Sequence, residues 1–302
     1  MASAKDWLEG ARLRTLPAAA APVFMGAGAA AHLHGFSWGK SLLALVVALF
    51  LQIGVNFSND YSDGIRGTDQ HRVGPLRLTA SGAVPPKTVL GVALGCFATA
   101  GVAGVALVAW SGMWWLLAVG VGAVVAAWFY TGGKNPYGYS GVGASEALVF
   151  IFFGLFATVG TTVVQTHSAP WWLWVAASGI GIASVSLLMV NNLRDIPTDT
   201  VAGKRTVAVR LGDRASRVTY VILLVISAGL SAVAAAGTGA SWPWTLAVGG
   251  VLALAAAPGA VQVLSGARGS ALLSTLRNTG LYTLAYGVVL SAVFTLGAPD
   301  AL

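Results

Sequence analysis

Long apolar runs, separated by short polar or glycine-rich breaks, dominate the hydropathy pattern of this 302-residue chain. Runs of about 18 or more apolar residues are long enough to cross a bilayer as helices. The chain contains nine such runs, and the pattern therefore predicts an all-α integral membrane protein with nine transmembrane helices. We expect the helices at residues 16–35, 39–59, 87–110, 113–131, 144–165, 171–193, 217–236, 243–265 and 278–297.

Composition supports the same fold class. Only 9% of the residues are charged and the mean hydropathy is +0.77, whereas ordinary soluble domains carry about 25% charged residues. A soluble protein of this length would need a more highly charged surface. The single cysteine, Cys96, lies inside an apolar run, so we interpret it as a small buried hydrophobic side chain without a disulfide partner in this chain.

The first apolar run resembles a secretory signal peptide, because Lys5, Arg12 and Arg14 precede an alanine-rich stretch. However, Pro17 and Pro22 interrupt that stretch, and further apolar runs follow it. We therefore expect a retained first helix.

The basic residues are distributed unevenly between the two sides of the membrane. If the nine runs alternate in direction, every Lys and Arg except Lys40 falls on the side of the N-terminus. The positive-inside rule places that side in the cytoplasm and the C-terminus outside. The net charge of +7 then suits contact with anionic lipid and an anionic substrate, with no nucleic acid partner. We expect one transmembrane domain over residues 1–302, in the cell membrane, with cytoplasmic loops at about 60–86 and 194–216.

Carboxylates are scarce, yet they gather at the predicted cytoplasmic ends of runs 39–59 and 171–193. A carboxylate costs about 2.5–3.5 kcal/mol at the centre of a membrane helix, so such a cluster needs a reason. In the first group, Asn56, Asn59, Asp60 and Asp63 follow the i, i+3, i+4, i+7 spacing of one helical face. Oxygen ligands on one face suit Mg²⁺, which keeps several waters that phosphate oxygens can replace.

The second group places Asn191, Asp195 and Asp199 at i, i+4 and i+8. Pro197 lies between the two aspartates and has no amide hydrogen for the helical ladder. The helix is therefore expected to end near Ile196, with Asp199 on a following turn. This favours a metal role for Asp195 over one for Asp199.

Basic residues follow both acidic groups along the chain: Arg66, Arg72 and Arg77 after the first, and Lys204, Arg205 and Arg210 after the second. A metal ion with Arg and Lys around a leaving diphosphate stabilises the charge that develops as the bond breaks. Any one of these residues, taken alone, is as readily interpreted as a solvated loop charge that sets the topology. We keep that interpretation for Arg268 and Arg277. Two Asn/Asp groups, each followed by cations, favour a shared diphosphate site.

Four stretches resemble the intramembrane aromatic prenyltransferases of the UbiA superfamily: RLRTLP at 12–17, NDYSDGIRGTD at 59–69, YTGGKNPYGY at 130–139, and NNLRD at 191–195 followed by GKRT at 203–206. The acidic motifs of that superfamily follow its second and sixth helices, as they do here. The Gly-Thr-Asp and NNLRD forms are similar to the branch that prenylates 1,4-dihydroxy-2-naphthoate.

The resemblance implies nine helices around a central cavity that opens near the cytoplasmic face. It implies transfer of a polyprenyl chain from polyprenyl diphosphate to dihydroxynaphthoate, with loss of CO₂ and diphosphate, to give demethylmenaquinol in menaquinone biosynthesis. Mg²⁺ would be the cofactor, held by Asp60, Asp63, Asp195 and Asp199. Arg66 and Lys204 would act in catalysis with the metal by stabilising the departing diphosphate. Arg14 or Lys134 would pair with the acceptor carboxylate. Further substrate contacts would come from Asn56, Asn59, Asp69, Arg72, Arg77, Tyr130, Asn191, Asn192 and Arg205.

Two alternatives remain at the level of sequence. One is a related prenyltransferase with another acceptor, such as 4-hydroxybenzoate. The other is a transporter, a class in which inverted repeats are common. Transporter charges tend to lie near the membrane midplane, whereas the charges here lie at one edge, which favours the enzyme.

Overall fold

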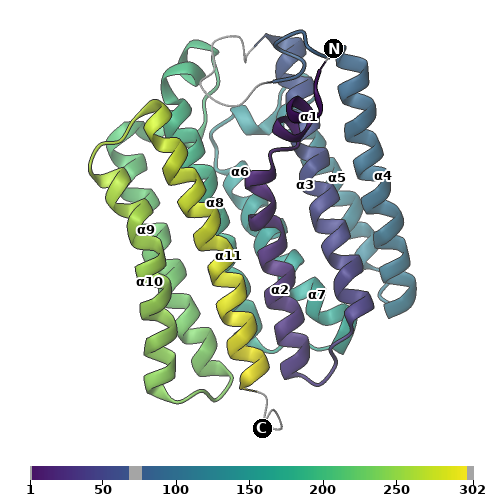
Figure 1. Cartoon of the computed structure of the whole chain (residues 1–302), viewed down its shortest axis with the longest axis vertical. Coiled ribbons are helices and arrows are strands. Elements are labelled where there is room, and N and C mark those ends of the chain that lie inside the picture. Colours follow the sequence, from purple (N-terminus) through teal and green to yellow (C-terminus); the bar gives the residue numbers. More distant parts are fainter. Residues whose placement is uncertain (1, 68–76, 298–302) are drawn as a thin grey trace.

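The computed structural model describes residues 2–67 and 77–297, and these residues form a bundle of helices (Figure 1). The longer helices are α1 (Ala4–Ala11), α2 (Leu16–His32), α3 (Trp38–Arg66), α4 (Pro86–Ser111), α5 (Leu116–Thr131), α6 (Ala144–Val149), α7 (Ala157–Thr166), α8 (Trp171–Val201), α9 (Val207–Gly237), α10 (Trp242–Leu264) and α11 (Leu272–Leu296). Short turns η1 (Leu13–Thr15), η2 (Tyr137–Tyr139) and η4 (Gly269–Ala271) are 3₁₀-helical, and the π-helix η3 (Phe150–Phe156) joins α6 to α7. The all-helical prediction is confirmed for the described residues.

Each predicted apolar run corresponds to one helical segment, if α6, η3 and α7 are counted as the single segment Ala144–Thr166. Among the described residues, seven segments are long and apolar enough to cross a membrane. The other two, α2 and α5, have 17 and 16 residues and are shorter. The described chain begins at α1 and ends at α11, at opposite ends of the bundle (Figure 1).

The predicted helix ends are wrong where the acidic groups lie. We expected helices to end at residues 59 and 193, but α3 continues to Arg66 and α8 to Val201. Likewise, α9 begins at Val207, ten residues before the predicted start at 217. Hydropathy detects the apolar part of a helix, and it loses the helix where polar residues follow. The start of the predicted loop 60–86 and most of the predicted loop 194–216 are therefore helical.

The prediction that Pro197 ends its helix is also wrong. Proline removes one backbone donor from the ladder, but α8 runs through it to Val201. The hydroxyls of Thr198 and Thr200 donate to carbonyl groups three and four residues earlier, at 3.0 and 2.7 Å. These bonds support the last turns, so Asp199 stays on the same helix as the rest of its group.

The bundle has a tightly packed side and an open side. On the packed side, α2 lies directly against α11, and a Cβ at Gly287 would lie 2.3 Å from the carbonyl oxygen of Ala21. On the open side, the only buried residue of α5 is Thr131. Cys96 in α4 is half-buried, so the prediction that it is fully buried is wrong. The loose packing of α5 leaves room for a cavity next to α3.

Candidate functional site

A cavity of about 1120 Å³ lies within the bundle, and most of its wall is apolar. Side chains of α2, α3, α4, α5, α8 and α11 line it, together with residues of α1 and η1. Both acidic groups line one part of this cavity. A volume of this order accommodates a ligand larger than most drug-sized molecules, which occupy sites of about 300–1000 Å³.

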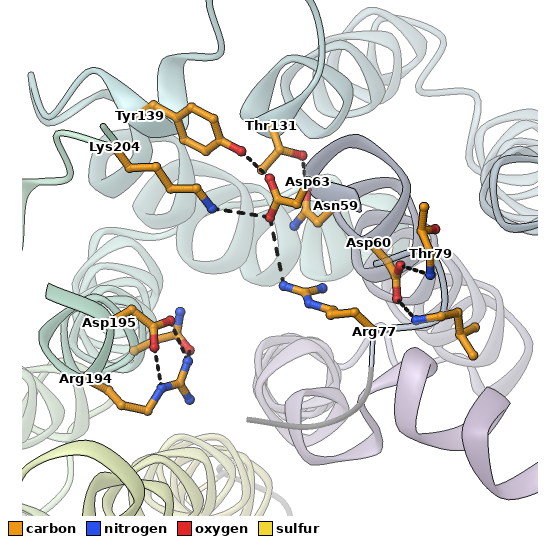
Figure 2. A network of polar contacts seen from close by, with 12 residues as sticks. Asn59, Asp60, Asp63, Arg77, Thr79, Thr131, Tyr139, Arg194, Asp195 and Lys204 are labelled. Atoms are coloured by element: carbon orange, nitrogen blue, oxygen red, sulfur yellow. Dashed lines mark hydrogen bonds and ion pairs between the residues drawn. The ribbon is translucent and has the colours of Figure 1, made fainter. Parts of the chain in front are cut away.

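Asp60 holds a returning segment of chain in place. Its two carboxylate oxygens accept hydrogen bonds from the backbone amides of Leu78, at 2.8 Å, and Thr79, at 2.9 Å (Figure 2). The side chain is 1% exposed and lines the cavity. This anchor brings the preceding residue, Arg77, close to Asp63.

Asp63, one turn further along α3, is surrounded by cations. Its carboxylate lies 3.6 Å from the ammonium of Lys204 and 3.9 Å from the guanidinium of Arg77, and it accepts a hydrogen bond from the hydroxyl of Tyr139 (Figure 2). All the charged members of this group are buried. The carboxylate of Asp63 therefore lies between two buried cations from other segments of the chain.

The asparagines of the first group contact neighbouring segments. The hydroxyl of Thr131 donates to Asn59 Oδ1 at 2.7 Å (Figure 2). The side-chain amide of Asn56 donates to the carbonyl oxygen of Ala11 at 2.9 Å and to the hydroxyl of Thr15 at 3.1 Å. Asn56 therefore fastens the segment that carries Arg14 to α3, beside the cavity.

In the second acidic group, Asp195 forms an ion pair with its neighbour on α8. Arg194 donates to both carboxylate oxygens of Asp195, at 2.6 Å each, and to Asn191 Oδ1 at 3.0 Å. Figure 2 shows this pair on the opposite side of the view from Asp60. Asn192 and Asp199 are buried and also line the cavity.

The remaining predicted site residues divide into two sets. Arg14 and Tyr130 line the cavity, although Arg14 is exposed. Lys134 and Arg205 are exposed and lie outside the cavity lining. Arg66 is half-buried; it donates to the carbonyl oxygen of Gly133 and is not part of the lining either. Asp69 and Arg72 lie outside the described residues.

Sequence reasoning missed three residues at the cavity. Tyr139 lies in a loop without helical periodicity, although the stretch at 130–139 pointed to its neighbourhood. Arg194 was visible inside the NNLRD stretch but had no assigned role. Arg277, interpreted as an ordinary loop charge, lines the cavity from α11. Only the fold reveals that these side chains reach the acidic groups or the cavity.

The donor set fits magnesium better than a transition metal. Within residues 2–67 and 77–297, no three His, Cys, Asp or Glu side chains cluster closely enough to hold a metal by themselves. Mg²⁺ commonly binds through one or two carboxylates, waters and substrate phosphates, so it does not need such a cluster. The oxygen donors of α3 and α8 line the same cavity, and the cations Arg77 and Lys204 line it beside Asp63. The residues present fit Mg²⁺ brought together with a diphosphate.

The sequence profile of the UbiA prenyltransferase family matches residues 19–281. The chain is 47% identical to a 1,4-dihydroxy-2-naphthoate octaprenyltransferase of Mycobacterium tuberculosis, over 98% of this chain and 99% of the relative. It is 35% identical to the Escherichia coli protein of the same name, over 72% of each chain.

Two archaeal structures have the same fold. One is a UbiA homolog from Archaeoglobus fulgidus bound to GPP and Mg²⁺, with a TM-score of 0.62 and 15% identity over 95% of this chain and 99% of that one. The other is the apo structure of a UbiA homolog from Aeropyrum pernix, with a TM-score of 0.67 and 14% identity over 91% and 96%.

Proposed function

The chain belongs to the UbiA prenyltransferase family, and we propose that it transfers a polyprenyl chain from polyprenyl diphosphate to 1,4-dihydroxy-2-naphthoate. The observation that carries this proposal is its near-full-length similarity to relatives named for that acceptor. The products are demethylmenaquinol, diphosphate and CO₂, so the enzyme acts in menaquinone biosynthesis. The geometry agrees, because a large apolar cavity meets a cationic, oxygen-rich region at the ends of α3 and α8.

The donor's diphosphate lies between the two acidic groups. Lys204 and Arg77 stabilise its charge from the α3 side, while Arg194 lies on the α8 side. Asp60, Asp63, Asp195 and Asp199 would hold magnesium, which would supply Lewis-acid stabilisation of the leaving group. The apolar wall of the cavity holds the prenyl tail, which needs no polar recognition.

The reaction itself requires little covalent chemistry from the protein. The bond between the first prenyl carbon and the diphosphate oxygen breaks, which leaves an allylic cation. The electron-rich ring attacks this cation, and loss of the acceptor carboxylate as CO₂ restores aromaticity. The cavity supports these steps by excluding water from the cation and by preorganised charges around the leaving group.

Arg14 is our candidate for the acceptor carboxylate. It lines the cavity, whereas the other candidate, Lys134, does not. Tyr130 and Asn191 also line the cavity, and we assign them the orientation of the ring. Asn56 fixes the segment of Arg14 through the carbonyl of Ala11, so it acts on the acceptor indirectly.

The chain is a multi-pass membrane protein, and nine crossings are part of this proposal. The 16 residues of α5 span about 24 Å, and a helix of that length is accommodated by local thinning of the bilayer. The ends of α3 and α8 face the cytoplasm together with the N-terminus, because all Lys and Arg except Lys40 belong to that side. Lys40 lies near the other end, where its ammonium donates to the carbonyl of Val164.

An acceptor panel tests the function. Purified protein in lipid is supplied with labelled polyprenyl diphosphate, Mg²⁺ and either dihydroxynaphthoate or 4-hydroxybenzoate. We expect prenylated product and equimolar CO₂ with dihydroxynaphthoate alone. Turnover with 4-hydroxybenzoate and none with dihydroxynaphthoate would refute the acceptor. Substrate flux in proteoliposomes without any product would instead support the transporter alternative.

A further inference from the structure

The loop between α5 and α6 brings one aromatic residue into contact with both halves of the site. The hydroxyl of Tyr139 donates to the carboxylate of Asp63 on α3. The ammonium of Lys204, which follows α8, lies 4.8 Å from the centre of the same ring. In addition, the backbone amide of Arg205 donates to the carbonyl oxygen of Tyr139 at 2.9 Å.

Asp63, Tyr139 and Lys204 form a closed triangle, because Lys204 is also 3.6 Å from Asp63 (Figure 2). A cation within about 6 Å of an aromatic centre is attracted by the ring. The guanidinium of Arg66 lies 5.7 Å from this ring as well. Tyr139 thus contacts a carboxylate through its hydroxyl and two cations through its ring.

The backbone around Tyr139 leaves it little freedom to move. A Cβ at Gly138 would lie 2.4 Å from the carbonyl oxygen of Tyr130. Gly141 has a φ of +63°, and a Cβ there would lie 1.8 Å from the carbonyl oxygen of Arg205. Only glycine permits such close approaches, so the turn is packed directly against α5 on one side and against the segment after α8 on the other.

We propose that Tyr139 is a positioning residue that holds Lys204 and Asp63 in the arrangement that binds the donor's diphosphate. Without the phenol, the ammonium of Lys204 and the carboxylate of Asp63 can pair more closely with each other. The ammonium is then less able to bind the ligand. When the phenol is present, its hydroxyl donates a hydrogen bond to the carboxylate of Asp63 and its ring attracts the ammonium of Lys204. The ammonium is therefore preorganised to bind phosphate. The inference rests on the proposed function only for the identity of the ligand.

Two substitutions separate the contributions of hydroxyl and ring. Tyr139→Phe removes the hydrogen bond to Asp63 and retains the ring beside Lys204. Tyr139→Leu removes both. We expect the KM for polyprenyl diphosphate to rise about fivefold in the first variant and about thirtyfold in the second, with the KM for dihydroxynaphthoate unchanged.

Tyr137 in the same turn provides a matched control. Its hydroxyl donates to the carbonyl of Ala126 on α5, at 2.7 Å, away from the charged triangle. Burial raises its pKa to about 12, so it is neutral in the assay and Tyr137→Phe changes no charge. We expect this variant to lower the thermal midpoint while the KM for the diphosphate stays at the wild-type value.

A binding measurement without turnover completes the test. Calorimetric titration of solubilised protein with inorganic diphosphate and Mg²⁺ should show weaker binding in both Tyr139 variants, in the same order as their KM values. Equal binding by wild type and Tyr139→Leu, or an equal loss in Tyr137→Phe, would overturn the inference while leaving the proposed function intact. A wild-type protein that binds no diphosphate would overturn both.

Discussion

The two acidic groups look alike in the sequence but are used differently in the fold. Asp60 and Asp63 contact chain segments that lie far away in the sequence, through Leu78, Tyr139 and Lys204. Asp195 instead pairs with the arginine immediately before it, which also reaches Asn191 on the same helix. The first group therefore joins several chain segments at the site, whereas the described pair of the second group, Arg194 and Asp195, lies within one helix.

This difference determines what a substitution removes. In the first group, a lost carboxylate leaves buried backbone amides or cations from other segments without their partner. In the second, it leaves one buried guanidinium, and a second substitution on the same helix can remove that group too. Four experiments, in order of decreasing expected effect, test the contrast.

The largest effect is expected for Asp60→Ala. The amides of Leu78 and Thr79 would then be buried without this acceptor, at about 1–3 kcal/mol each, so we expect stability to fall by about 2–6 kcal/mol. Activity should be lost as well. The thermal midpoint in detergent measures this loss. Asp60→Asn, which keeps one carbonyl acceptor, serves as the control. Its thermal midpoint should lie between those of the wild type and Asp60→Ala. A wild-type midpoint for Asp60→Ala would contradict the anchoring role.

Asp63→Asn should impair the reaction more than it destabilises the fold. The side chain keeps an oxygen for the Tyr139 hydroxyl but loses the charge that faces Lys204 and Arg77. We expect turnover to fall by about 10²–10³-fold, as is typical when a preorganised group around a developing charge is removed. Initial rates with labelled polyprenyl diphosphate measure it, and near-normal turnover would exclude Asp63 as a metal ligand.

In the second group, stability should be recoverable. Asp195→Leu removes the carboxylate that pairs with the buried guanidinium of Arg194 and leaves its hydrogen bond to Asn191, so we expect a loss of about 2 kcal/mol in stability. Adding Arg194→Met should restore most of that loss, since a buried ion pair can be replaced by apolar side chains. Activity should stay absent in the double variant. A double-mutant cycle on thermal midpoints provides the measurement, and additive losses would show that the pair is not self-contained.

The smallest structural effect is expected from removal of the metal. Chelation of Mg²⁺ should abolish turnover, because the leaving diphosphate loses its Lewis acid. The thermal midpoint without substrate should move by less than about 1 °C, because Asp60 and Asp195 already have protein partners. Activity assays and melting curves, each with and without EDTA, measure the effect of metal removal on turnover and on stability. A marked drop in the midpoint would mean that the metal supports the fold.

The site was only partly predictable from the sequence. Helical spacing placed Asn56, Asp60 and Asp63 on one face, and all three line the cavity from α3. The spacing of Asn191, Asp195 and Asp199 was also sound, although the proline between the aspartates suggested a break that the fold does not contain. Propensity is a weak guide there because hydroxyl groups and packing outweigh one missing backbone bond.

The sequence by itself determined the class of protein, the positions of nine helical segments and the family, because apolar length and motif spacing are local properties. Only the tertiary structure decided which partner each charge has. Tyr139 and Asp63 are 76 residues apart, and Asp60 is 18 residues from Leu78. No periodicity relates positions at such separations, since loop geometry and helix packing bring them together. The sequence thus determined the acidic pattern that both groups share, whereas the fold determined the different contacts that each group makes.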